Sequence, residues 1–407
     1  MIRILNHKDA AQLILRKNVR LDEAEKIVAP ILAAVRERGD AALLEYARKF
    51  DGFDGKSVRM DVRGSLTPSF QASVTTAANN IREYAQAQLP REWFTEYPDG
   101  RKLGQIVRPI DAMGAYVPAG RYPLPSTVLM TVIPAQVAGV TTTCIACPKP
   151  SAEIMGIAAW LGVSHMFCMG GAQAIAAFAY GTETVPRVDR IVGPGNIYVA
   201  AAKKLVAGET GIDFVAGPTE IVIIAEDGNP RWIAADLLAQ AEHDIDASAI
   251  LLTTSSSLAH AVADEVERQL TTLPTEAIAR PSIETNGAIV VLDSMERAIE
   301  ICNALAPEHL ALHDGTLLSK IRHAGAIFLG PSSPEAAGDY VSGPNHVLPT
   351  SGAARQRGGL SSADFVKVIA VQQLSALALE SLTPAITQLA RAEGLEAHAR
   401  SAEVRRS

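Results

Sequence analysis

An acidic and an imidazole side chain stand next to each other in the segment Ala306-Pro307-Glu308-His309-Leu310. A neutral imidazole at His309 could take a proton from a hydroxyl group, and the carboxylate of Glu308 could take one from water. Helix neighbours point about 100° apart, so the pair can serve one reacting centre only on extended or turned backbone. The plainer interpretation is that Glu308 is a cap and His309 a hydrogen-bonded structural residue. Pro307 disfavours a helix interior and should push Ala306 toward extended geometry.

Two other polar segments could bind a metal ion. Gln240 and His243 are three residues apart at the end of an expected helix, so they share one face, and an amide oxygen and an imidazole are both metal ligands. Asp339 and His346 lie in a second, glycine-rich polar segment. Each segment also has an ordinary explanation, as a polar helix terminus and as a solvated surface loop.

Two glycine-rich loops each follow an expected strand and open an expected helix. They are Gly170-Gly171-Ala172-Gln173 and Gly193-Pro194-Gly195-Asn196. Glycine lets backbone N–H groups approach a nucleotide, and a helix N-terminus favours anionic groups. Neither loop has the G-x-G-x-x-G pattern, so each alone could be a tight structural turn.

Two further candidate sites have plain explanations. Cys144 and Cys147 form an isolated C-x-x-C with no second pair, so a metal or redox site is a poor interpretation. His398 follows Glu393 by five residues in the last helical segment, where a solvated helix face explains both.

The elements that must position these residues follow a regular alternation. From about residue 104, short β-branched or apolar runs alternate with helices as far as residue 225, and a second such series runs from 231 to 328. This rhythm predicts an α/β fold with mostly parallel sheets and helices on both faces. It places Glu308 and His309 where a helix at 295–304 gives way to a strand. The chain before residue 104 and after about residue 362 is expected to be helical.

The composition excludes several classes of protein. The residues are 48% hydrophobic and 20% charged, which is ordinary for a compact protein. A chain of 407 residues is too long for one domain. The chain has 44 acidic and 37 basic residues, 5% aromatics and no long run of Lys and Arg, so nucleic-acid binding is not expected. Four cysteines are too few for a disulfide scaffold, and the charged N-terminus argues against a secretory signal. We therefore expect a cytoplasmic small-molecule enzyme.

One stretch, Ser126 to Pro148, is uncharged and long enough to span a bilayer. Pro134, Gly139 and the run of threonines at 141–143 favour a buried helix followed by a buried strand. We therefore expect no membrane span.

Taken together, these segments closely resemble the histidinol dehydrogenase family, from about Asp22 to His398. Seven ordered strings support the resemblance: Gly114-Ala115-Tyr116-Val117-Pro118, Gly170-Gly171-Ala172-Gln173-Ala174, Val192-Gly193-Pro194-Gly195-Asn196, Ala216-Gly217-Pro218-Thr219-Glu220, Gln240-Ala241-Glu242-His243, Ala306-Pro307-Glu308-His309-Leu310, and Ala337-Gly338-Asp339-Tyr340 running on to Asn345-His346-Val347-Leu348-Pro349-Thr350.

The resemblance implies an active site shared across a homodimer. Its zinc ligands would be Gln240, His243, Asp339 and His398, and its proton-transfer pair would be Glu308 and His309. NAD would contact Tyr116, Gln173 and Asn196. The residues expected to contact substrate are Thr219, Gln240, His243, His309, Asp339, His346, Glu393 and His398, of which Glu393 and His398 would come from the neighbouring subunit.

The resemblance also implies a domain plan. It has two Rossmann-like parallel-sheet domains with helical extensions at both ends. The expected boundaries are a helical arm at 1–20, a discontinuous first domain at 21–113 and 223–362, an NAD-binding second domain at 114–222, and a helical dimerisation segment at 363–407.

The implied reaction is a four-electron oxidation of an amino alcohol, L-histidinol, to the amino acid through a retained aldehyde, with two hydrides passed to two NAD molecules. Three positions depart from the family pattern: Thr219 where serine is common, Ala119 where glycine is usual, and Ile245 where proline is frequent. They leave open a paralogue that acts on another polar alcohol. A catalytically silent binding homologue is a further alternative.

Overall fold

The computed structural model describes residues 1–6, 21–119 and 122–405. These residues form two compact units. The first contains Met1–Gln88 and Asp111–Phe365, and the second contains Leu89–Ile110 and Val366–Ser407. The expectation that the chain before residue 104 is helical, with a helical arm at 1–20, is wrong at Arg3–Asn6, Arg59–Met60 and Trp93–Glu96, which are strands. Residues 7–20 of the expected arm lie outside the described residues.

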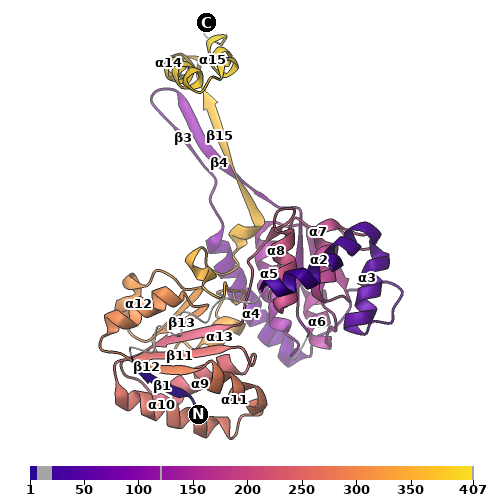
Figure 1. The fold of residues 1–407 in the computed structure, drawn as a ribbon. Helices are drawn as coiled ribbons and strands as arrows, with labels where there is room; N and C mark the ends of the chain where they lie inside the picture. The colour runs from indigo at the N-terminus through magenta and orange to yellow at the C-terminus, as the bar shows by residue number, and fades with distance from the viewer. Residues whose placement is uncertain (7–20, 120–121, 406–407) are drawn as a thin grey trace. The chain divides into compact units, whose positions relative to one another are not determined.

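One six-stranded sheet of the first unit has the order β1-β12-β11-β10-β13-β14, and all its pairings are parallel. Helices cover both faces (Figure 1). Because both faces are covered, its central strands are almost continuously apolar. The strands are β1 (Arg3–Asn6), β10 (Glu220–Ile224), β11 (Ser248–Thr253), β12 (Ala288–Val291), β13 (His309–Leu312) and β14 (Ala326–Leu329). The helices are α9 (Pro230–Ala241), α10 (Ser256–Leu270) and α11 (Glu276–Thr285) on one face, α12 (Met295–Leu305) on the other, and the short α13 (Glu335–Tyr340).

A second six-stranded sheet of the first unit has the order β2-β7-β6-β5-β8-β9, and only the β2–β7 pairing is antiparallel. Its strands are β2 (Arg59–Met60), β5 (Ala112–Tyr116), β6 (Thr142–Ala146), β7 (His165–Phe167), β8 (Arg190–Val192) and β9 (Gly211–Ile212). Its helices are α2 (Leu21–Arg38), α3 (Asp40–Tyr46), α4 (Pro68–Gln88), α5 (Pro125–Ala138), α6 (Ala152–Trp160), α7 (Gly171–Tyr180) and α8 (Ile197–Val206). Both sheets confirm the predicted α/β class.

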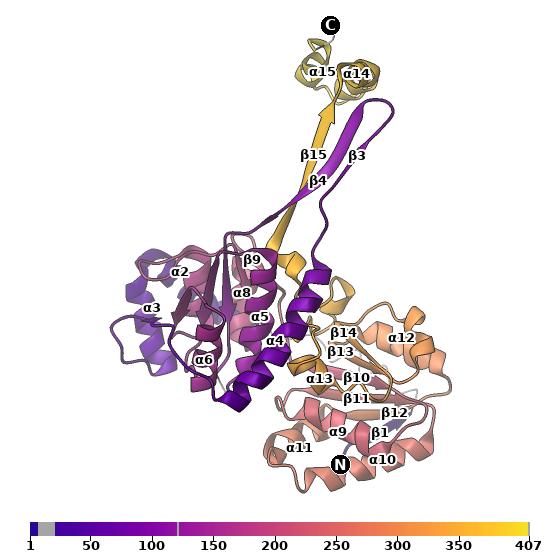
Figure 2. The same ribbon diagram turned by 180° about the vertical axis from the view of Figure 1, so that it is seen from behind.

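The packing of α2 differs from the expectation that residues 21–113 belong with 223–362. Val28, Leu32 and Val35 on α2 are buried in one core with residues of α7 and α8. Figure 2 shows α2 next to α8. The apolar stripe of α2 therefore completes the sheet of β5 to β9.

The second unit is a three-stranded antiparallel sheet followed by two helices. It contains β3 (Trp93–Glu96), β4 (Arg101–Pro109), β15 (Val366–Leu374), α14 (Ala376–Ala392) and α15 (Glu396–Glu403). The expectation of an entirely helical segment after residue 362 is therefore wrong at β15. The β-branched residues Val366, Val368, Ile369 and Val371 favour a strand, and β4 supplies its partner.

The uncharged stretch forms α5 followed by β6, as predicted. Within the described ranges, no helix has both the length and the apolar character needed to cross a bilayer. Cys144 and Cys147 are buried free thiols, and burial raises the pKa of each to about 12. Inert buried thiols agree with a structural role for the C-x-x-C.

The helix α12 ends at Leu305 and β13 begins at His309, so Glu308 and His309 lie at the predicted junction. The expected extended geometry of Ala306 is wrong. Ala306 has φ 48° and ψ 62°, the left-handed conformation. There it closes the helix, and its N–H donates to the Cys302 carbonyl at 2.8 Å. This left-handed cap turns the chain sharply before the reactive pair.

Candidate active site

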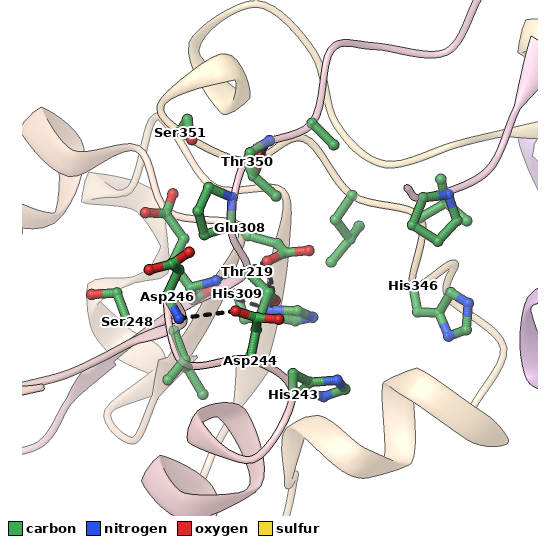
Figure 3. Close-up of a pocket in the computed structure, with 18 of the residues that line it drawn as sticks. Thr219, His243, Asp244, Asp246, Ser248, Glu308, His309, His346, Thr350 and Ser351 are labelled. Atoms are coloured by element: carbon green, nitrogen blue, oxygen red, sulfur yellow. Dashed lines mark hydrogen bonds and ion pairs between the residues drawn. The ribbon is translucent and has the colours of Figure 1, made fainter. Parts of the chain in front are cut away.

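A cavity of about 910 Å³ in the first unit contains most of the predicted site residues (Figure 3). On the first sheet it lies at the amino ends of the strands, because Thr219 precedes β10 and His309 opens β13. On the second sheet it lies beyond the carboxyl ends, where Pro118 follows β5 and Asn196 follows β8. Figure 3 shows Thr219, Glu308 and His309 gathered together, with His243 near them and His346 set apart.

Glu308 is buried, with 6% of its surface exposed, and its carboxylate is fixed by two donors. Its Oε2 accepts hydrogen bonds from the Thr219 hydroxyl at 2.5 Å and from the Glu220 N–H at 2.9 Å. Burial raises the pKa of Glu308 to about 7, although the nearby His309 and these two donors oppose the rise. A carboxyl group with a pKa near neutrality can both take up and release a proton.

His309, which lines the cavity, has one ring nitrogen with a hydrogen-bond partner and one without, among the described residues. Its Nδ1 donates to the Glu220 carbonyl at 3.3 Å, and its ring stacks on Phe328. Its Nε2 is buried and, among the described residues, has no hydrogen-bond partner; Asp339 Oδ1 lies 3.6 Å away. This assignment leaves Nε2 with the free lone pair that a general base needs.

Burial alone would lower the pKa of His309. The negative charges of Glu335, Glu308 and Asp339 outweigh that effect and raise its pKa to about 10. The imidazole therefore needs a compensating positive charge beside these carboxylates before it is neutral at physiological pH.

Three of the four predicted metal ligands converge. Gln240 is fully buried on α9, His243 follows that helix, and Asp339 lies on α13. His243 Nε2 is 4.0 Å from Asp339 Oδ2. One ligand atom each from His243, Asp339 and Glu335 lies within 4.8 Å of the others. An imidazole, an amide and carboxylates suit a borderline divalent cation, and the unpaired His309 Nε2 points to a missing polar neighbour. The residues present therefore fit zinc.

His346 lies on the wall of the cavity, as expected of a substrate contact. Its Nδ1 donates to the Asp339 carbonyl at 2.8 Å, and its Nε2 lies 3.3 Å from the Thr127 hydroxyl. These contacts fix the ring relative to α13 and α5.

The predicted NAD contacts divide into two groups. Asn196 is exposed in the cavity wall, and its side chain also caps α8 by accepting from Tyr198 and Val199. Tyr116 and Gln173 are buried and do not line the cavity. The Tyr116 hydroxyl accepts from the Gly171 N–H at 3.1 Å, so it supports the glycine loop rather than the cavity.

His398 and Glu393 belong to the second unit, where both are exposed. His398 lies on α15, and Glu393 ends α14. Their expected role in a neighbouring subunit therefore stays a prediction.

Two residues of the site were missed by sequence reasoning. Glu335 is 2% exposed and faces Gln240 and His309. Its spacing of four residues from Asp339 on a helix was the available signal. Asp51 accepts from the Gly170 N–H at 2.9 Å and from Gln173 Nε2 at 3.1 Å, so it anchors the first glycine loop. No signal in the sequence connected Asp51 with a loop more than 100 residues away.

Comparison with known proteins agrees with this geometry. The family model for histidinol dehydrogenase matches residues 14–406. The histidinol dehydrogenase of Halalkalibacterium halodurans is 48% identical over 420 residues, covering 99% of both chains. That of Geobacillus kaustophilus is 49% identical over 399 residues, covering 94% of both. The crystal structure of histidinol dehydrogenase from Elizabethkingia anophelis is 36% identical, covers 99% of this chain and 98% of its own, and has a TM-score of 0.93.

The fold, the paired acid and base and these relatives define an oxidoreductase, a dehydrogenase that acts on CH–OH groups. More particularly, the chain belongs to the histidinol dehydrogenase family.

Proposed function

We propose that the chain is an NAD-dependent, zinc-containing L-histidinol dehydrogenase that oxidises L-histidinol through L-histidinaldehyde to L-histidine. The observation that carries the proposal is His309 Nε2, which has no hydrogen-bond partner among the described residues and lies beside Asp339, while Glu308 lies near Nδ1 and His243 lies near Asp339. Family membership at 48% identity over 99% of the chain supports the substrate.

His309 serves as the base in both oxidations. In the first, its Nε2 takes the hydroxyl proton while the carbon-bound hydrogen leaves as hydride to NAD. In the second, it takes a proton from the hydrated aldehyde while another hydride leaves to a second NAD. The Glu220 carbonyl holds Nδ1–H, so Nε2 stays the accepting nitrogen.

Glu308 activates the water that hydrates the aldehyde. Its pKa near 7 matches proton transfer at neutral pH. The donors from Thr219 and the Glu220 N–H fix the direction in which the carboxylate can accept a proton. One water is consumed per turnover. The alcohol and this water together lose two hydrides and three protons, and the product is the carboxylate.

Gln240, His243 and Asp339 would hold zinc, with His398 supplied by the partner in a homodimer. Bound zinc supplies Lewis-acid chemistry and positive charge among the carboxylates around His309. Asp339, His346, Thr219 and the partner's Glu393 would orient the substrate. Retention of the aldehyde fits a largely buried reactive pair.

NAD would lie over the second sheet, with its contacts at Asn196 and at the loop that Tyr116 and Gln173 support. Support for this placement comes from the cavity, which extends past Pro118 to Asn196 beyond the carboxyl ends of β5 and β8. We assign the enzyme to the cytoplasm.

The deciding experiment is the stoichiometry of NADH formed per L-histidinol consumed, before and after removal of metal by a chelator. We expect two NADH per substrate, loss of activity on chelation and recovery with zinc. One NADH per substrate would instead indicate a paralogue, with attention turned to the methyl group of Thr219. No turnover in zinc-loaded protein would indicate a silent homologue.

A further inference from the structure

We propose that Glu335 is a positioning residue of the metal centre. It orients the side-chain amide of Gln240 and thereby decides whether the amide oxygen or the amide nitrogen faces a bound cation. The proposal deepens the zinc site of the proposed function and adds a residue outside the four expected ligands.

The helix α13 places Glu335 next to the proposed metal ligand Asp339. It opens α13 one turn before Asp339, so the two carboxylates lie on the same face. It is 2% exposed, and its Oε1 lies 3.8 Å from His309 Nδ1. A buried carboxylate is stable only with hydrogen bonds or a nearby positive charge.

The main neighbour of Glu335 is the Gln240 amide, which is fully buried. When Gln240 Nε2 faces Glu335, it donates to the two carboxylate oxygens at 2.7 and 3.1 Å, and Gln240 Oε1 accepts from the Thr219 hydroxyl at 2.5 Å. This orientation satisfies the amide without a metal ion.

The reverse orientation is stabilised by a cation. Gln240 Oε1 then faces the Glu335 carboxyl group at the same short distances, and the two oxygens repel each other unless a proton or a positive charge lies between them. In exchange, Gln240 Nε2 donates to the Thr219 hydroxyl, which is free to donate to Glu308. Only this orientation offers an amide oxygen as a ligand while keeping the donor to Glu308.

A second observation indicates that a ligand belongs here. His309 Nε2, buried and without a hydrogen-bond partner among the described residues, faces Asp339 on the same helix as Glu335. Glu335 also offers a carboxylate oxygen within 4.8 Å of ligand atoms on His243 and Asp339. Removing Glu335 should therefore weaken cation binding even though the four expected ligands stay.

The test measures zinc affinity by competition with a chromophoric chelator, using the full-length metal-free protein and Glu335→Gln. We expect roughly 10- to 100-fold weaker zinc binding, the range for groups that orient metal ligands. The cobalt(II)-substituted variant should also show shifted visible absorption bands, because the ligand field changes when the Gln240 amide is no longer fixed.

Two control variants separate contact from charge. Glu335→Asp keeps the charge but shortens the reach to Gln240, so it should also weaken zinc binding. Asp236→Asn removes a carboxylate whose charge acts on Glu335 but which lies one turn away from Gln240 on α9, and it should leave zinc affinity within about threefold.

Zinc affinity and cobalt bands of Glu335→Gln equal to those of the native protein would overturn the proposal. So would an equal loss in Asp236→Asn, because that result would assign the effect to charge alone. Zinc affinity is measured without substrate. If the native protein failed to oxidise histidinol, the proposed function would be refuted, but the zinc affinities would still test the role of Glu335.

Discussion

At His309, the direction of the ring decides the chemistry. The Glu220 carbonyl accepts a hydrogen bond from Nδ1–H, so in the neutral imidazole Nε2 is the nitrogen with a free lone pair. The carboxylates of Glu335, Glu308 and Asp339 raise its pKa. A cation beside Asp339 would oppose that rise, and this links metal binding to the readiness of the base.

We predict that His309→Gln lowers kcat by two to four orders of magnitude, the usual contribution of a general base, while the protein keeps its zinc. Glutamine fills similar space but cannot accept and release a proton. The measurements are steady-state kinetics and zinc content per subunit. Near-native kcat would remove His309 as the base.

A second prediction concerns Asp236, a half-buried residue of α9. Burial raises its pKa from 3.8 to about 6. A raised carboxyl pKa stabilises the fold below the unfolded-state pKa, and this contribution is lost as pH rises through about 6. Asp236→Asn should therefore be more stable than the native protein at pH 8, on the order of 1–2 kcal/mol after allowance for its partial exposure, with a smaller difference at pH 5.

Urea unfolding at the two pH values checks the Asp236 prediction. An equal stability difference at pH 5 and pH 8 would show that the substitution acts through packing rather than through the charge of Asp236.

The local sequence predicted site residues that lie in short motifs, such as Glu308 and His309 between α12 and β13. It was not informative for Glu335 or Asp51, whose roles depend on which distant groups they meet. Asp51 is a loop anchor only because α3 and the π-helix after it, Ala47–Asp51, bring it to Gly170. Such contacts are tertiary, and no spacing along the chain encodes them.

At the scale of elements, a buried ion pair between Lys203 and Asp213 holds the second glycine loop, residues 193–196, in place. Lys203 Nζ on α8 lies 2.6 Å from Asp213 Oδ1 and donates to the Gly193 carbonyl at 2.6 Å. Asp213 Oδ2 accepts from the Gly193 N–H at 2.8 Å. Both side chains are almost fully buried, with 3% and 0% exposed. Both backbone polar groups of Gly193 are thus held before Asn196 enters the cavity wall.

We predict that Lys203→Met destabilises the fold by about 3–5 kcal/mol, because the Asp213 carboxylate is left buried without its cation. KM for NAD should rise tenfold or more in the folded fraction. Lys204→Met is the matched control: Lys204 is the next residue, pairs with Glu25 at the surface, and should change little. Thermal unfolding and NAD titration provide the measurements, and equal effects of the two variants would contradict the prediction.

Periodicity predicted most of the longer helices and strands of the two sheets, but not their partners, and it missed β1, β2, β9, α11 and α13. The apolar stripe of α2 was visible, yet the sheet that it covers depends on complementary surfaces on α7 and α8. The strand β15 was missed because its residues are mostly exposed and show no regular alternation of burial, and β4 supplies its pairing from far away in the chain.

At the scale of the whole molecule, the proposed metal ligands are divided between the two units. Gln240, His243 and Asp339 belong to the first, and His398 belongs to the second. If the partner supplies His398, then one chain's first unit and the other chain's second unit make each site.

We therefore predict that two inactive variants complement each other. His243→Asn and His398→Asn subunits, mixed after dissociation and reassociated, should regain about a quarter of native activity, because about half of the dimers are mixed and each has one intact site. Reassociated single variants are the controls and should stay inactive. A mixture without activity, in which mixed dimers are shown by mass spectrometry, would place His398 in the site of its own chain.

The pairing of β4 with β15 joins segments roughly 250 residues apart in the chain. During synthesis at about 5–20 residues per second, β4 therefore waits on the order of 10–50 s for its partner strand to emerge from the ribosome. Arg101, Lys102 and Arg108 give the waiting strand charged positions that discourage pairing with other chains. His398 emerges later still, so a nascent chain cannot offer the complete set of proposed zinc ligands. If the proposed ligands hold zinc, the complete site would form only in the assembled protein, after translation has ended.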